Sequence, residues 1–178
     1  MSPLLLVPFG VATRSYRRHR VMDKILPGLA AIQNIHPMFV HFPIAFFWGA
    51  LAMESAAMVI YERFHFVATW LLYLGALAAG VSAITGLHAM NKIAAASGGH
   101  HGPNHGLIHV HEHWMLSVTT MGVLLAAYLY WMNTGRVWNG HRWRFVVGLL
   151  LLAVVLTLGA DRGARLVFQF GFGVIPPS

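Results

Sequence analysis

Four long apolar segments constrain the fold of this chain more than any other feature of its sequence. They run from 38 to 61, from 66 to 90, from 109 to 131 and from 143 to 158 or a little beyond. Each is close to the length of about 20 apolar residues that a helix needs to cross a bilayer. The sequence therefore predicts an all-α protein, an integral membrane four-helix transmembrane bundle.

The composition points to a lipid environment. Hydrophobic residues make up 57% of the chain and charged residues 10%, whereas a soluble domain carries about a quarter charged residues. The formal net charge is +7, which in a membrane protein reflects lipid headgroups and the positive-inside bias. The sequence has no basic stripe with interleaved aromatic residues, so nucleic acid is not expected as a partner. The absence of cysteine excludes disulfides, iron–sulfur clusters, thiolate metal sites and covalently attached c-type haem.

The connections between the segments predict the topology. We name the end where the first helix starts side A and the opposite end side B. Residues 62–65 form a tight turn and residues 133–136 begin a short link, both at side B. The connection 91–108 is longer and irregular because of its glycines and Pro103. Four crossings place this His-rich loop and both ends of the chain at side A.

Two regions are expected along the chain. Residues 1–34 form an N-terminal basic, interfacial segment, and residues 35–178 form a single four-helix transmembrane domain with the His-rich loop 91–108. The first 20 residues place an apolar part before a basic part, which is the wrong order for a signal peptide. The organised pattern begins just after Met22, which is a candidate alternative start.

The basic residues leave the orientation open. The positive-inside rule makes side A cytoplasmic if translation starts at Met1, but the counts of the two sides tie if it starts at Met22. The basic residues assigned to side A are Arg14, Arg17, Arg18, Arg20, Lys24, Lys92, Arg162 and Arg165; those assigned to side B are Arg63, Arg136, Arg142 and Arg144.

Histidines gather at side A. The first helix carries two, the second carries one, and three lie at the start of the third, so three helices present imidazoles at about one depth. Four-helix bundles build cofactor sites in this way, from side chains on facing helices. These histidines are His36, His41, His88, His109, His111 and His113.

Helical periodicity favours one pair among them. The helix face of His41 continues through mostly small residues, which leaves room for a flat ring, and the face of His113 is also slim. His111 points elsewhere. We predict a b-type haem, one or two per chain, held by one imidazole from the first helix and one from the third. His36 and His88 could supply a second pair, bind propionates or close a polar network. The predicted cofactor-binding residues are His36, His41, His88, His111 and His113.

Two alternatives stay open. The first is binding or transport of a divalent metal, Zn or Cu, by the loop histidines and by His41, His109, His111 and His113. The second is a structural or assembly subunit without a cofactor. No catalytic residue is predicted, so the leading hypothesis is a non-catalytic electron-transfer subunit of an oxidoreductase complex. Its partners would be quinone and other membrane or redox subunits docking at side A. Histidines expected to be solvated or interfacial are His19, His65, His100, His101, His105 and His141.

Three other features carry expectations. Glu54 lies inside the first span, where an ionisable residue suggests function; a hydrogen-bonded structural carboxyl is favoured over proton transfer. Pro43 frees a carbonyl near Phe39 and is expected to kink the helix or delay its start. Asp161, Arg162 and Arg165 are expected to form an interfacial ion pair, with propionate binding as the alternative. Small residues at 75, 79, 83 and 86 predict close helix packing within the bundle, with a homo-oligomer contact as the alternative.

Several motifs resemble one family. The stretch from His36 to Ala45, HPMFVHFPIA, resembles the HPxxVHFPIA opening of DUF2231, a bacterial family of predicted membrane proteins of unknown function. Thr85-Gly86 resembles its Thr-Gly step, and His111-Glu112 or Glu112-His113 resembles its histidine before the third helix. Residues 159–174 resemble its closing pattern GGxLVYRHGVGV, with Gln169-Phe170 where the family often has Arg-His.

The resemblance covers 35–175 and implies a four-helix domain in a bacterial inner membrane. Some members of the family are joined to cytochrome c-like domains, which favours redox work. If the Arg-His histidine is a ligand elsewhere in the family, this chain must use another one.

Overall fold

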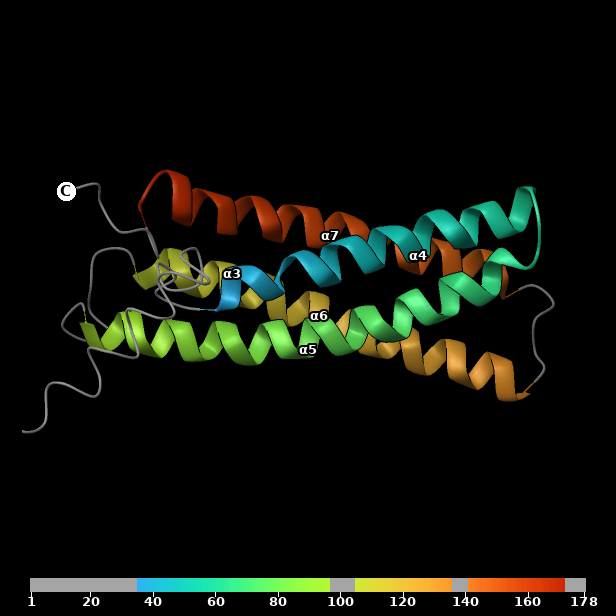
Figure 1. Ribbon diagram of the computed structural model, residues 1–178, viewed down its shortest axis with the longest axis horizontal. Helices are drawn as coiled ribbons and strands as arrows, with labels where there is room; N and C mark the ends of the chain where they lie inside the picture. The colour runs from blue at the N-terminus through green and yellow to red at the C-terminus, as the bar shows by residue number, and fades with distance from the viewer. Residues whose placement is uncertain (1–34, 97–104, 136–140, 172–178) are drawn as a thin grey trace, which may run out of the picture. The chain divides into compact units, whose positions relative to one another are not determined.

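The computed structural model describes residues 35–96, 105–135 and 141–171. They belong to the unit Asn34–Ser178, one of two compact units into which the chain divides. Their helices are α3 (His36–Phe39), α4 (His41–Val59), α5 (Phe64–Ala96), α6 (His105–Gly135) and α7 (Arg142–Phe168) (Figure 1). The expected segment 1–34 and the loop histidines His100 and His101 lie outside the described residues.

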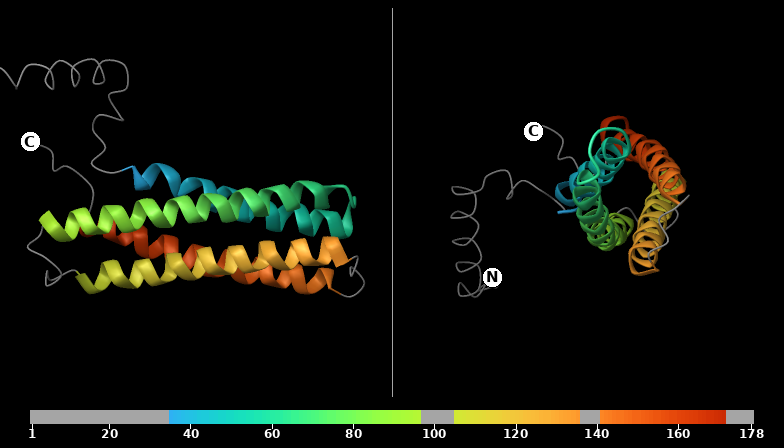
Figure 2. Two further views of the ribbon diagram at one scale, coloured as in Figure 1. Left: turned by 90° about the horizontal axis from the view of Figure 1, so that it is seen from below. Right: turned by 90° about the vertical axis from the view of Figure 1, so that its right-hand side faces the viewer.

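The four long helices lie side by side as a bundle (Figure 2). Contacts join α4 to α5, α5 to α6, α6 to α7 and α7 back to α4. The ring closes in this order, so α4 and α6 are diagonally opposite, as are α5 and α7. The end-on view in Figure 2 shows the helices around a common axis.

All four helices are long and apolar enough to cross a membrane. The candidate spans are His36–Val59, Phe64–Asn91, Gly106–Gly135 and Arg142–Phe168, and between 22% and 33% of an apolar 18-residue stretch in each is buried in the protein. Large apolar side chains cover the outer faces and need lipid around them; examples are Leu77, Ile84, Leu124 and Leu151. The predicted membrane four-helix fold is confirmed.

The helices run further than the apolar segments predicted. Helix α5 continues to Ala96 and α6 begins at His105, so both ends of the expected loop 91–108 are helical. Residues 94–96 are alanines, the best helix formers, which favours continuation beyond the bilayer. The 33 residues of α5 span about 50 Å, against about 30 Å of hydrocarbon. Helix α7 likewise continues well past Leu158, to Phe168.

A short break separates α3 from α4. Val40 lies between them in a turn, and Pro37 occupies the first turn of α3, where its missing N–H costs nothing. Pro43 has no N–H to donate to the carbonyl of Phe39, which would be its partner in a continuous helix. The expected late start of the helix is therefore seen as a break just before His41.

The centre of the bundle is filled by the Phe47 ring. A Cβ on Gly75 of α5 would lie 2.7 Å from that ring, and one on Gly122 of α6 would lie 2.6 Å from it. Phe47 thus fits between two glycines, and the predicted role of the small residues in packing within the bundle holds at Gly75. The remaining buried core is apolar and includes Ala50, Leu72, Ala79, Val118, Leu129, Leu149, Leu152 and Leu156.

Candidate functional site

Exposed aromatic residues fix the depth of the histidines. Tyr61, Tyr130, Trp131 and Trp143 are each more than half exposed at side B, where indole and phenol rings favour the headgroup level. About 20 residues of helix cross the hydrocarbon. Counting that length from Tyr61 back along α4 reaches about residue 41, and from Trp131 back along α6 it reaches about residue 111. Counting forward from Trp143 along α7 reaches about residue 163. The side A histidines therefore lie at the opposite membrane boundary.

His36 points into the bundle, against α5. Its Nδ1 lies 3.3 Å from the Thr85 hydroxyl, and a Cβ on Gly86 would lie 2.9 Å from its ring. Thr85 directs its own proton to the carbonyls of Val81 and Ser82, each 3.0 Å away. The Thr85 oxygen is then an acceptor for Nδ1–H of His36, and the ring also forms a hydrogen bond with the backbone of Ser82.

His111 makes the equivalent arrangement against α7. Its Nδ1 lies 3.0 Å from the carbonyl oxygen of Gly159, and a Cβ on Gly163 would lie 2.7 Å from its ring. Because a carbonyl can only accept, Nδ1 carries the proton and Nε2 carries the lone pair. Metal-binding histidines commonly have their second ring nitrogen held in this way.

The two imidazoles lie near one another inside the bundle. His36 and His111 are half-buried and close enough to interact electrostatically. They come from the first and third membrane spans, which lie diagonally opposite each other across the bundle axis. Each is backed by a glycine of the helix that follows it, Gly86 or Gly163. Ser82, whose hydroxyl is buried without a hydrogen-bond partner among the described residues, lies one turn from Gly86.

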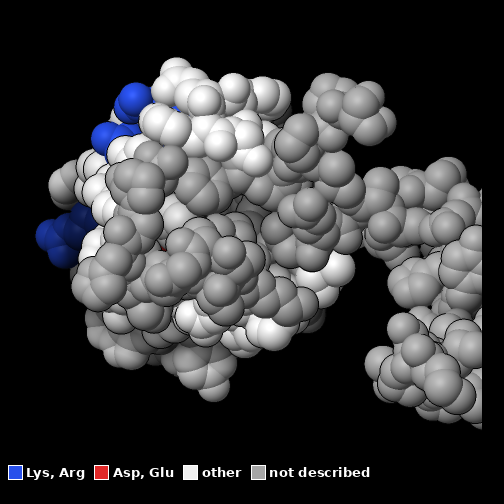
Figure 3. Space-filling model, turned by 90° about the vertical axis from the view of Figure 1, so that its left-hand side faces the viewer, with Lys and Arg blue, Asp and Glu red and all other residues white. Residues whose placement is uncertain are grey.

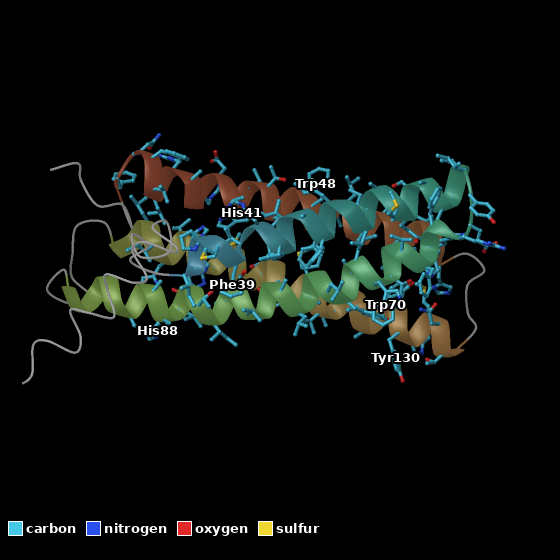
Figure 4. All side chains as sticks on the ribbon, viewed as in Figure 1. Phe39, His41, Trp48, Trp70, His88 and Tyr130 are labelled. Atoms are coloured by element: carbon cyan, nitrogen blue, oxygen red, sulfur yellow. The ribbon has the colours of Figure 1, made fainter. Side chains whose placement is uncertain are left out.

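The inward orientation predicted for His41 and His113 is wrong. Both side chains are exposed, and so is His88; Figure 4 shows His41 and His88 on their helices. Helical periodicity correctly placed His111 and His113 on different faces of α6. The face that points into the bundle, however, is the one that carries His111. His36 and His41 likewise lie on different faces, because they are five residues apart and Val40 between them keeps helical dihedral angles. The structure therefore brings together His36 and His111 and leaves the other three predicted residues on the outer surface.

The histidines expected to hold a metal ion do not converge. Within the described ranges no three His, Cys, Asp or Glu side chains are grouped so that they could hold one. His109 instead bonds Glu112, with 2.8 Å between Nδ1 and Oε2. The ring centroid of His109 lies 6.4 Å from that of His113. The His-rich loop, 97–104, lies outside the described residues.

A second polar cluster lies at side B, around Glu54. This carboxylate is fully buried. Nδ1 of His65 lies 2.6 Å from one of its oxygens, and Nε of Arg142 lies 2.9 Å from the other. The expected hydrogen-bonded carboxyl is thus found, and it ties α4, α5 and α7 together. Arg142 also lies 3.7 Å from Glu62, which is exposed.

Sequence reasoning missed the partners of Glu54. It treated His65 as an interfacial residue and counted Arg142 only as a charge on side B. The available signal was that all three residues lie near side B, with Glu54 about a turn or two inside the membrane. A buried carboxylate is costly without a cation or donors, so this placement predicts partners from neighbouring helix ends.

Basic residues mark the side A end of α7. The Arg162 guanidinium lies 4.4 Å from the centre of the Trp114 ring and donates to the carbonyl of Leu158 at 2.7 Å. Arg165 donates to Gln169 at 3.2 Å. These contacts differ from the expected pairing of Asp161 with the arginines. The view of this end in Figure 3 shows basic side chains along one edge of the bundle.

The fold and the paired imidazoles define a four-helix integral membrane protein with a polar site at one membrane boundary. The sequence profile of the family described as "Predicted membrane protein (DUF2231)" matches residues 32–176. The chain belongs to this family. The comparisons with curated proteins and with solved structures each found no match.

The motifs that resemble this family meet at the inner site. The opening motif supplies His36, and the Thr-Gly step supplies Thr85 and Gly86. Of the two candidates before the third helix, His111 is the inward one, and its partner Gly159 begins the closing pattern. The opening motif thus contacts the Thr-Gly step, His111 contacts the closing pattern, and the two histidines are close enough to interact electrostatically.

Proposed function

We propose that this chain is a b-type haem-binding electron-transfer subunit of a bacterial inner membrane, in which His36 and His111 would hold the haem iron. The observation that carries the proposal is the pair of inward imidazoles on diagonal helices, each held through Nδ1. Imidazole is a common axial ligand of haem iron. The donor set therefore fits a haem, although the residues differ from the pair His41 and His113 expected from periodicity.

The surroundings support this assignment. Gly86 and Gly163 let both rings lie against neighbouring helices, where any Cβ would collide with them. The hydrogen bonds to Thr85 and Gly159 orient both rings and raise their basicity as ligands. Arg162, next to Gly163 in the chain, is a candidate to pair with propionates at the membrane boundary.

The apolar middle of the bundle favours electron transfer over ion transport. Between the inner site and the Glu54 cluster lie the Phe47 ring and the buried side chains of Leu72, Val118 and Leu149. A divalent ion crossing this region would lose its hydration without gaining ligands. An electron needs no such path. A bound haem would supply one-electron chemistry, passing electrons between a quinol or membrane partner and a redox protein at side A.

Absorption spectroscopy tests the proposal directly. The full chain, purified from haem-supplied membranes, should show a Soret band that shifts on dithionite reduction. His36→Ala and His111→Ala should each abolish or strongly alter this band. His41→Ala and His88→Ala are matched controls from the exposed set and should leave it unchanged. Absence of a Soret band in well-folded protein, or its loss only in the control variants, contradicts the proposal.

A further inference from the structure

The outer face of α7 carries a stripe of apolar residues that ends in two arginines at side A. Positions three or four apart on a helix lie on the same face. Counting from Leu158 at these spacings places Arg162 and Arg165 on the same face as the apolar residues before them. The apolar members of the stripe are Val147, Leu151, Val154 and Leu158, and each is more than 40% exposed. This face of α7 therefore has an apolar body and a cationic end.

The two arginines lie at the depth of the lipid headgroups. The membrane boundary crosses α7 at about residue 163, between Arg162 and Arg165. From Leu158 back to Val147 the helix rises about 16 Å, which is close to half of the hydrocarbon thickness of about 30 Å. An acyl chain of the side A leaflet thus has the length of the apolar stripe, while its headgroup lies beside the arginines.

Trp114 and the backbone of α7 hold the Arg162 guanidinium in place. Its Cζ lies 4.4 Å from the centre of the Trp114 ring, within the range of a cation–π contact. One of its N–H groups donates to the carbonyl of Leu158 at 2.7 Å. Trp114 is itself packed against α7, because a Cβ on Gly159 would lie 3.1 Å from the Trp114 Cβ. A guanidinium has five N–H donors in a planar fork that fits phosphate oxygens, so Arg162 can bind a phosphate while it keeps both contacts.

We propose that this face of α7, together with Trp114 of α6, binds an anionic phospholipid whose phosphate lies between Arg162 and Arg165. A lipid suits the surface better than a soluble phosphate, because its acyl chain covers the apolar stripe. Asp161 is exposed on the adjacent face, but two arginines outweigh one carboxylate and favour a negative headgroup. The surface lies outside the bundle, so the proposal stands whether or not haem is bound.

Native mass spectrometry of the full chain, released from detergent micelles, tests this site. Phosphatidylglycerol and phosphatidylcholine with identical acyl chains are titrated separately, and the affinities of the first bound lipid are compared. We expect phosphatidylglycerol to bind about tenfold more tightly or better, since each arginine beside an anionic headgroup contributes about fivefold. An excess of glycerol phosphate should not displace it, because the soluble headgroup does not use the apolar stripe. Displacement would identify a site for soluble anions and overturn the lipid site.

Variants locate the bound lipid. Arg162→Gln and Arg165→Gln should each weaken phosphatidylglycerol binding by about fivefold and leave phosphatidylcholine binding unchanged. Arg162→Lys keeps the charge but loses the planar fork, so it should weaken binding less than Arg162→Gln. Arg144→Gln is the matched control, because Arg144 lies on the same face of α7 but at side B, with its guanidinium 5.8 Å from the centre of the Trp143 ring. It lies about 27 Å along the helix from Arg162, well beyond the Debye length, so the control should bind phosphatidylglycerol like its parent.

The outcomes separate this site from the proposed haem site. Equal affinity for the two lipids overturns the lipid site, as does a loss in Arg144→Gln equal to that in Arg162→Gln. A Soret band that changes in Arg162→Gln while phosphatidylglycerol binding stays would assign Arg162 to haem propionates and also overturn it. A lipid preference without any Soret band supports the lipid site and contradicts the haem proposal alone. Size-exclusion chromatography and circular dichroism check folding, and Arg162→Lys with Arg165→Lys repeats the test if a glutamine variant does not fold.

Discussion

At the scale of single residues, two glycines determine how closely the inward imidazoles approach their neighbouring helices. Gly86→Ala would place a methyl group 2.9 Å from the His36 ring, forcing that ring away from Thr85. We expect a loss of about 1–2 kcal/mol in the free energy of unfolding, from crowding and a weakened hydrogen bond. Unfolding in mixed detergent micelles, followed by circular dichroism, measures this loss.

Gly80→Ala is the matched control in the same helix. A Cβ at Gly80 meets no described atom within 4 Å, so alanine should be neutral or stabilise the helix by up to about 1 kcal/mol. Equal destabilisation by both substitutions would argue against the close approach of His36 to Gly86.

The buried carboxylate supports a second prediction at this scale. Arg142→Ala removes a cation that lies 2.9 Å from Glu54 and leaves the buried carboxylate with His65 as its partner among the described residues. Removing one partner of a buried ion pair costs about 3–5 kcal/mol, and we expect about 3 kcal/mol because Arg142 keeps partial exposure. Detergent unfolding curves of the variant and the parent measure the difference.

Neighbouring and paired substitutions provide the controls. Arg144→Ala removes an exposed arginine of the same helix and should cost less than about 1 kcal/mol. Glu54→Gln combined with Arg142→Ala should cost less than the sum of the two single changes, because the residues interact directly. Additive losses would contradict the ion pair.

The sequence indicated the helices of the inner site but not all of its residues. Hydropathy and topology alone predicted that the histidines of the first and third spans lie at the same end of the bundle. The choice between His111 and His113 depends on the rotation of α6, which is set by packing against Gly159 and Gly163. The choice between His36 and His41 depends on which face of the first span packs against α5, and His36 is the one that contacts Thr85 and Gly86. Neither rotation can be derived from periodicity within one helix.

At the scale of helices, the fit of Phe47 between α5 and α6 supports a third prediction. Gly122→Ala would place a methyl group 2.6 Å from the Phe47 ring, and we expect it to cost about 1–3 kcal/mol. Phe47→Leu should partly rescue Gly122→Ala, because the smaller side chain relieves the clash. A double-mutant cycle of unfolding free energies should show coupling of at least about 0.5 kcal/mol. Phe47→Leu combined with Gly80→Ala should be additive, and additivity in both cycles would contradict this packing.

Helix number and order followed from the sequence, whereas helix length did not. A window of apolar residues detects the part of a helix that lies in lipid. It cannot detect the extension of α5 through the alanines before Ala96, or of α7 through Arg162 and Arg165. These turns are held by backbone hydrogen bonds and helix propensity, which need no apolar surface.

At the scale of the whole molecule, four crossings place the end of α5, the start of α6 and the end of α7 on one side of the membrane. The chain has no cysteine, so single introduced cysteines can report the side by their reaction with a membrane-impermeant maleimide. Asn91→Cys and Gln169→Cys lie at side A, Thr134→Cys lies at side B, and all three positions are exposed.

The two side A cysteines should react alike, and Thr134→Cys should react only from the opposite face. If translation starts at Met1, the excess of basic residues at side A predicts that Asn91→Cys and Gln169→Cys react only after the cytoplasmic face is opened. Reaction of those two cysteines in intact cells would reverse the orientation while leaving the bundle valid. Reaction of Asn91→Cys and Gln169→Cys from different faces would contradict an even number of crossings between them, and with it the contact of His111 with Gly159, which needs the start of α6 and the end of α7 on one side.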